Sequence, residues 1–153
     1  MSLISANTIF INKQAEKTLT EAVLKKVNEE QKYNPTRAFA VVQVCGKQFK
    51  VTTGDVIIIE GYWPPDVGDK LRLDKVLCAG GVNFSVFGTP LVQHGLVDVQ
   101  ATVIEKTLSH TKTHFRKKRR KQYMNINFYR TPRTMLRIND VRIGQLKETV
   151  DEY

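Results

Sequence analysis

The sequence predicts a mainly β protein: a small β-barrel that carries a long basic loop or hairpin and an N-terminal α-helical extension. Three observations lead to this prediction. Apolar residues recur at helical spacing only ahead of Asn34-Pro35. Beyond that point they alternate with polar residues in short runs between turn residues, which is typical of strands. Residues 110–137 hold ten Lys and Arg residues and no Asp or Glu, so this segment exposes charge and has little to bury.

The first 37 residues are expected to form an extension that contains one amphipathic helix. From Lys13 to Gln31, apolar residues recur at spacings of three and four among Lys and Glu: Ala15, Leu19, Ala22, Val23 and Val27. Asn12 is a candidate N-cap, and Asn34-Pro35 ends the helix because proline restricts the residue before it. The charges are mixed and no aromatic anchor is present, so docking on its own domain or on a neighbour is favoured over a membrane surface.

Residues 38–143 are expected to form the barrel, because short strands follow one another without intervening helices and so small a set closes most easily as a barrel. Gly46-Lys47 and Thr53-Gly54-Asp55 mark turns, and Pro64-Pro65 marks an irregular loop. The acidic tail, residues 144–153, is expected to be frayed or helical. The expected strands are 38–44, 48–52, 56–60, 70–79, 82–87, 97–107 and 134–143.

Length and composition limit the class of protein. A chain of 153 residues favours one domain. Cys45 and Cys78 have no CxxC partner, so both are expected to be small buried residues rather than parts of a disulfide framework or a zinc site. No apolar run exceeds five residues, so a soluble protein without a spanning helix is expected. The first 36 residues hold four Glu and no Arg, which predicts that no intact organelle presequence is present.

The basic segment is expected to bind a polyanion. Residues 110–137 carry +10, whereas the rest of the chain sums to −1. The segment lies between a strand that ends near Thr107 and another that starts near Thr134, so it leaves the barrel and returns as a long loop or extended hairpin. A localisation run usually ends after about five to eight residues, and a solvated face usually includes acids. Nucleic acid is therefore favoured.

The residue types in this segment suit RNA. Cations at short spacing contact phosphates, and aromatic rings stack on bases or sugars. If roughly six to ten cations reach phosphates, affinity should fall about 10³- to 10⁵-fold between about 50 and 200 mM salt. The residues that suggest this chemistry are Phe115, Arg116, Lys117, Lys118, Arg119, Arg120, Lys121, Tyr123, Phe128, Tyr129, Arg130 and Arg133.

Other motifs are weaker. Gly46-Lys47 lacks the upstream glycine of a P-loop, and Asn83-Phe84-Ser85 is a glycosylation sequon without a secretory signal. His110 and His114 have a spacing that could suit a metal, but no Glu or Cys is nearby, so RNA contact or solvation is favoured. No catalytic constellation can be singled out. Binding without a cofactor, metal or small-molecule substrate is therefore expected.

Several motifs together resemble one family. They are FAVVQVCGKQFKVTTGDVIIIEG at 39–61, KVLCAGG at 75–81, the Gly88-Thr89-Pro90 turn, and VQATVIEKT leading to FRKKRRKQY within 99–123. This combination resembles ribosomal protein L-twenty-one of the bacterial-type large subunit, over about residues 38 to 143. The most specific part is the GKQ(F/Y)KV...GD hairpin followed roughly 65 residues later by F-x-x-K-R-R-K-x-Y.

The resemblance implies a small β-barrel whose long basic loop enters ribosomal RNA. It implies RNA contacts by Lys47, Lys50 and the cations of 112 to 137, which include Lys112 and Arg137. It also implies large-subunit ribosomal RNA and neighbouring large-subunit proteins as partners. Cys45 in place of the first glycine of GGKQ, FYRT at 128–131 and the extension before the barrel resemble the mitochondrial branch of the family.

The expected function is therefore that of a structural constituent of the mitochondrial large ribosomal subunit, in the mitochondrial matrix. A free-standing RNA-binding or translation-factor barrel is the alternative. An enzyme acting on RNA is a third reading, and it would need a pocket with a perturbed acid, base or metal.

Overall fold

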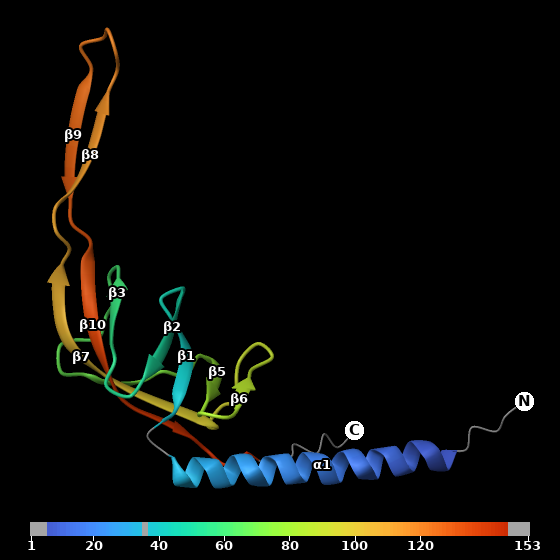
Figure 1. The fold of residues 1–153 in the computed structure, drawn as a ribbon. Coiled ribbons are helices and arrows are strands. Elements are labelled where there is room, and N and C mark those ends of the chain that lie inside the picture. The colour runs from blue at the N-terminus through green and yellow to red at the C-terminus, as the bar shows by residue number, and fades with distance from the viewer. Residues whose placement is uncertain (1–5, 35–36, 147–153) are drawn as a thin grey trace, which may run out of the picture.

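The computed structural model describes residues 6–34 and 37–146 and is mainly β with one N-terminal helix, as the sequence predicts (Figure 1). Helix α1 spans Ala6–Tyr33. It is followed by strands β1 (Phe39–Val44), β2 (Lys47–Thr52), β3 (Val56–Glu60), β4 (Lys70–Arg72), β5 (Val76–Gly80), β6 (Ser85–Phe87), β7 (Val97–Leu108), β8 (Lys112–Lys117), β9 (Met124–Tyr129) and β10 (Pro132–Ile143).

The strands form two four-stranded antiparallel sheets and one separate hairpin. One sheet has the order β2-β1-β5-β6, the other β3-β10-β7-β4, and β8 pairs only with β9. The pairing found among the described residues does not join the two larger sheets into one closed barrel. The barrel therefore stays a prediction. Figure 1 shows the β8-β9 hairpin extending from the ends of β7 and β10, away from α1.

The apolar core lies where the two larger sheets meet. Alternate residues of β1, β3, β7 and β10 point into it, as a strand with one covered face requires. The fully buried side chains include Val42 and Val51 from one sheet, and Val99, Leu136 and Ile138 from the other. On β7 the alternation of buried residues stops after Val103, where a bulge shifts the register against β10.

Two predicted strands differ from the structure. The predicted strand 70–79 is wrong as a single strand, because the chain changes sheets within it: β4 pairs with β7, whereas β5 pairs with β1. At the change, the Leu73 amide donates to the Val99 carbonyl at 2.9 Å. The predicted strand 82–87 is shortened to β6, because the Gly81 amide donates to the Phe84 carbonyl at 3.0 Å and closes a turn there.

The turn between β1 and β2 corrects the prediction for Cys45. Cys45 and Gly46 both have positive φ, 48° and 76°, which is the conformation of a tight type I′ hairpin turn. This places Cys45 at the surface instead of in the core. Cys78 is buried as predicted, and that burial raises the pKa of its thiol.

Helix α1 is longer than predicted and docks by its C-terminal half. It begins at Ala6, so Asn12 lies inside the helix and is not its N-cap. The Asn28 side chain pairs with the backbone of Leu146: Nδ2 donates to the carbonyl at 3.1 Å, and the Leu146 amide donates to Oδ1 at 3.0 Å. The Asn83 amide donates to Glu30 at 3.1 Å. The helix is thus attached to its own domain.

The predicted apolar stripe of α1 is only partly covered. Val27 is half-buried, whereas Leu19 and Val23 remain 65% and 58% exposed, and the Ala15 side chain falls outside the described residues. No helix in the described ranges is long and apolar enough to cross a membrane. In the predicted acidic tail, residues 144–146 have no regular structure and 147–153 lie outside the described residues.

Candidate RNA interface

The basic segment 110–133 leaves the body through a hydrogen-bonded neck, and its residues 110–131, which precede β10, are called the arm below. The body comprises β1–β7 and β10. At the neck, the buried Ser109 donates its amide to the Thr131 carbonyl at 2.8 Å, and the Thr131 amide donates to Ser109 Oγ at 2.9 Å. Just beyond, Arg130 Nε donates to Thr111 Oγ1 at 3.0 Å. These hydrogen bonds join the outgoing and returning segments of the chain at a point beyond the apolar core.

Beyond the neck the arm is an exposed two-stranded hairpin. Six opposite pairs, from Lys112 with Tyr129 to Lys117 with Met124, link β8 and β9. Apart from the half-buried Lys112, every residue of these two strands is exposed. Both faces of the hairpin are therefore accessible to a binding partner.

The tip of the arm gathers cations in a tight turn. The Lys118 amide donates to the Tyr123 carbonyl at 3.1 Å, and Lys118 Nζ lies 5.4 Å from the centre of the Tyr123 ring. Arg120 has a positive φ of 54°, which turns the chain back. The turn places four consecutive cations at the far end: Lys118, Arg119, Arg120 and Lys121.

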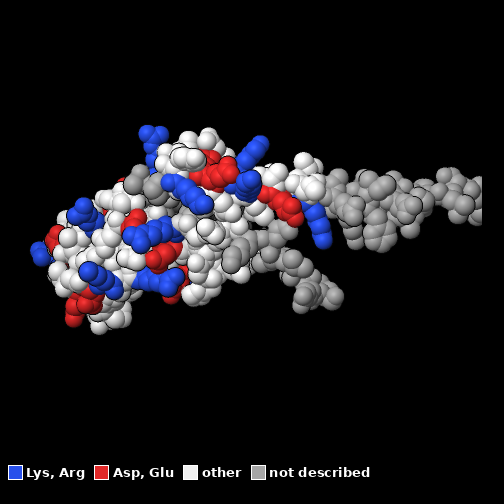
Figure 2. Space-filling model, turned by 90° about the horizontal axis from the view of Figure 1, so that it is seen from below, with Lys and Arg blue, Asp and Glu red and all other residues white. Residues whose placement is uncertain are grey.

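The charges of the body differ from those of the arm. On the face drawn in Figure 2, Lys and Arg lie among Asp and Glu. Ion pairs of the body include Lys106 with Asp66 at 3.1 Å and Arg72 with Asp98 at 2.8 Å. The arm contains no carboxylate side chain, so its own residues cannot neutralise its cations. Like charges at this density attract an anionic partner.

Four of the predicted RNA-binding cations lie on the body. Glu60 accepts from Arg133 Nη2 at 2.9 Å and from Lys47 Nζ at 3.3 Å, and these two bonds hold the pKa of the Glu60 carboxyl below its ordinary value. Lys50 Nζ lies 4.9 Å from the centre of the Phe39 ring. Arg137 is exposed on β10, opposite Val56. The other predicted residues lie together on the arm: Lys112, His114, Phe115, Arg116, Lys117, Lys118, Arg119, Arg120, Lys121, Tyr123 and Arg130.

Sequence reasoning missed part of the arm. Met124, Asn125, Ile126 and Asn127 were not predicted to contribute, because the prediction selected charged and aromatic residues. The structure places them on β9, with Met124 and Asn125 opposite the cations Lys117 and Arg116 of β8. The strict alternation of apolar residues with Asn in this stretch is a strand signal that could have identified them.

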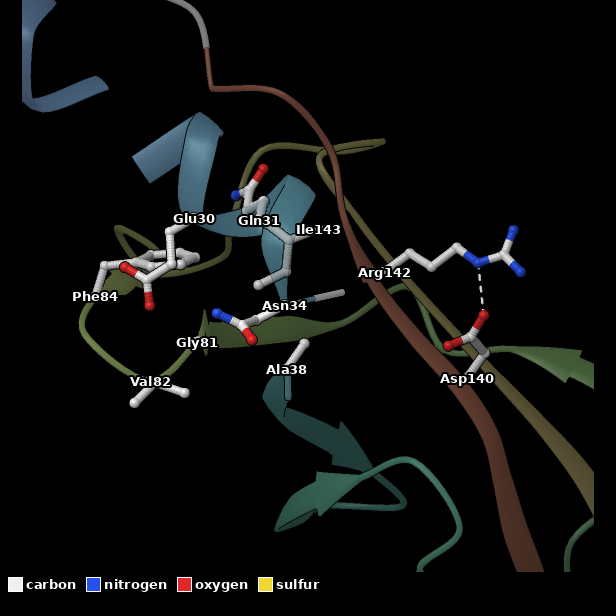
Figure 3. A pocket seen from close by; sticks show the side chains of 10 residues that line it. All are labelled: Glu30, Gln31, Asn34, Ala38, Gly81, Val82, Phe84, Asp140, Arg142 and Ile143. Carbon is white, nitrogen blue, oxygen red and sulfur yellow. Dashed lines mark hydrogen bonds and ion pairs between the residues drawn. The ribbon is translucent and has the colours of Figure 1, made fainter. Parts of the chain in front are cut away.

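A cavity of about 390 Å³ lies between α1 and the sheets (Figure 3). Among the residues that line it, Arg142 forms an ion pair with Asp140, and none is a Ser, Thr, Cys, Lys or His. In the described ranges there is no group of three or more His, Cys, Asp or Glu that could hold a metal ion. The lining residues are Glu30, Gln31, Asn34, Ala38, Gly81, Val82, Phe84, Asp140, Arg142 and Ile143.

Comparison with known families identifies the domain that carries the arm. A family model described as Ribosomal prokaryotic L21 protein matches residues 38–141. The chain belongs to the ribosomal L21 family. The match includes β1 to β9 and most of β10, and therefore the whole arm. The L21 family consists of structural ribosomal proteins and not of enzymes. Helix α1 lies outside the matched residues.

Relatives in the L21 family come from bacteria and eukaryotes. The chain is 42% identical to the large ribosomal subunit protein bL21m of Mus musculus, over 80% of this chain and 59% of that protein. It is 31% identical to bL21m of Dictyostelium discoideum, over 92% and 90% of the two chains. It is 39% identical to bL21 of Desulfatibacillum aliphaticivorans, over 69% and 98%. The chain thus spans less than two thirds of its mouse relative's length.

Proposed function

We propose that this protein is a structural, non-catalytic constituent of the large ribosomal subunit that binds and stabilises large-subunit ribosomal RNA through the arm. The observation that carries the proposal is the arm itself, an exposed hairpin without acids in a chain of the L21 family. RNA helices repel each other through their phosphates, so close packing requires cations between them. An arm that extends beyond its own domain can supply those cations inside folded RNA.

The proposed RNA contacts comprise two groups of residues. The arm group is the set from Lys112 to Arg130 that the structure gathers on the hairpin. The second group lies on the body and comprises Lys47, Lys50, Arg133 and Arg137. The bonds of Lys47 and Arg133 to Glu60 do not exclude phosphate, because a lysine has three donors and an arginine five.

The proposed organisation follows from the same elements. Residues 1–37 form an extension, 38–143 a small barrel built from the two sheets with the basic RNA-binding segment inserted at 110–133, and 144–153 an acidic tail. Similarity to the bL21m proteins of mouse and Dictyostelium supports a place in the mitochondrial large subunit, in the matrix. The proposed partners are large-subunit RNA and neighbouring large-subunit proteins. The proposal includes no membrane and no small-molecule partner.

Sedimentation of the tagged full chain in fractionated mitochondria tests this function. A structural constituent should co-sediment with the large subunit and remain there through moderate salt washes. Recovery mainly in fractions free of ribosomal particles would instead support a free-standing RNA-binding or translation-factor barrel.

A further inference from the structure

The two faces of the arm differ in chemistry. Side chains alternate across a paired strand, so each face carries every second residue of β8 and β9. The register sets Phe115 opposite Ile126, Thr113 opposite Phe128 and Lys117 opposite Met124 on one face. The other face carries Lys112, His114 and Arg116, with Tyr129, Asn127 and Asn125 opposite them. One face of the arm is thus mainly apolar, with Lys117 near the tip, and the other is mainly polar or cationic.

The apolar face is uncovered. Phe115 is 54% exposed, Ile126 43%, Phe128 67% and Met124 64%. Figure 1 shows that the hairpin extends beyond both larger sheets. A contiguous row of large apolar side chains at a protein surface is typical of a binding site. Neutralisation of phosphates requires only cations, so the exposed apolar row indicates a second kind of contact.

We infer that this face stacks on unpaired bases of the RNA whose phosphates the arm's cations bind, an inference that rests on the proposed function. Phe115 and Phe128 are diagonal neighbours on the face, at a separation of roughly 7–8 Å for such positions. Two exposed rings on one sheet surface form a stacking platform, and such platforms recognise single-stranded RNA because every base has an aromatic face.

The charge around the face favours RNA over a protein surface. Lys117 lies on the same face, and the cationic tip follows directly. The sequence holds no acid between Glu105 and Asp140, so the Lys and Arg side chains near the apolar row have no carboxylate of the same segment beside them. A single strand of RNA offers apolar base faces and negative charge together, whereas a protein partner would need a separate set of acids around its apolar patch.

Replacing the aromatic rings by apolar side chains without a ring tests the inference. In the full chain, Phe115→Leu and Phe128→Leu should each weaken binding to a single-stranded oligouridine by about 5- to 150-fold, the range for loss of one stacked base. The affinity for duplex RNA with the same number of phosphates should change little. The salt dependence of binding should also change little, for oligouridine and for the duplex. Phe128→Trp should keep the wild-type affinity for oligouridine, and oligouridine should quench the fluorescence of the introduced indole ring. Phe87→Leu, at an exposed ring on the body, is the matched control.

Each outcome separates this inference from the proposed function. If both leucine variants bind oligouridine as the wild type does and Phe128→Trp is not quenched, the face does not stack on bases. If those variants bind RNA normally but no longer co-sediment with the large subunit, the face contacts a protein, which also overturns the inference. The proposed function fails separately if the wild-type chain binds neither oligouridine nor duplex RNA.

Discussion

The strands of the body and those of the arm are paired in the same antiparallel way but differ in what they bury. On β7 and β10, Val99, Leu136 and Ile138 are fully buried between the sheets. On β9 every side chain is exposed. Hydrogen bonds between strands contribute little net free energy in water, whereas buried apolar area contributes much more. The body is therefore stable by itself, and an isolated two-stranded arm is marginal until a partner covers it.

Amide hydrogen exchange should give the largest difference between the two regions. Amides of β7 and β10 within the core should exchange only through global unfolding, and those of β8 and β9 through local opening of the hairpin. We expect a difference in protection of about 10³-fold or more in the free protein, for a domain of ordinary stability. Addition of RNA should slow exchange in the arm. Strong protection throughout 112–130 without RNA would contradict this view of the arm.

Truncation of a core side chain should be the next largest effect. Leu136→Ala removes a fully buried side chain and should lower the free energy of unfolding by about 2–5 kcal/mol. Val99→Ala should act in the same direction. The matched control is Ile126→Ala on the arm, which should change stability by no more than about 0.5 kcal/mol because its site is exposed. Urea unfolding curves measure all three.

Deletion of residues 1–34 should have a smaller effect on folding. No side chain of α1 belongs to the buried core among the described residues. The deletion removes the hydrogen bonds that Asn28 and Glu30 make with the body, each of which contributes about 0.5–1.5 kcal/mol. The truncated protein should fold but assemble less well into the large subunit. An unfolded product would mean that the helix belongs to the core.

The smallest expected effect concerns Asp55 and pH. Asp55 Oδ2 accepts from the Thr52 amide at 2.7 Å and from Thr52 Oγ1 at 2.8 Å, and these bonds lower the pKa of the carboxyl from 3.8. A pKa that is lower in the folded state stabilises the protein above 3.8, and this contribution is lost as the pH falls through the folded value.

Melting curves at neutral and acidic pH test whether Asp55 stabilises the protein more at neutral pH than in acid. Asp55→Asn should melt at a lower temperature than the wild type near neutral pH, and the gap should narrow in acid. Glu105→Gln, at an exposed carboxylate on β7, is the control. A gap that widens in acid would exclude the carboxylate bonds as its cause.

Much of the body could be predicted because its strands have one buried face. The apolar run that begins at Val56, between the turn at Gly54 and the loop at Gly61, predicted β3 with its observed bounds, and the structure buries Ile57 and Ile59 within it. The change of sheet after Arg72 was not predicted, although the alternation ends at the consecutive polar residues Asp74 and Lys75, because the sheet that each part joins depends on pairing with distant strands. Closure into a barrel depends on pairing between distant strands, which local periodicity does not determine.

The candidate site was predictable in composition and not in geometry. Charge alone identified the cations of the arm, since no acids interrupt them. The bonds of Lys47 and Arg133 to Glu60 depend on three separate strands meeting, so sequence spacing could not indicate them. The apolar face of the arm depends on the register between Phe115 and Ile126, which is set by the turn at the tip.

RNA titration of one variant tests the division between arm and body most directly. The variant replaces Arg116, Lys117, Lys118, Arg119, Arg120 and Lys121 by Gln, and large-subunit RNA is titrated at two salt concentrations beside a melting curve. Because these side chains are exposed, the melting temperature should stay nearly unchanged. Affinity should fall sharply, and the salt slope should shrink by about four to five if all six cations contact phosphates. A variant that binds with the wild-type salt slope would show that the arm is not the RNA-binding element.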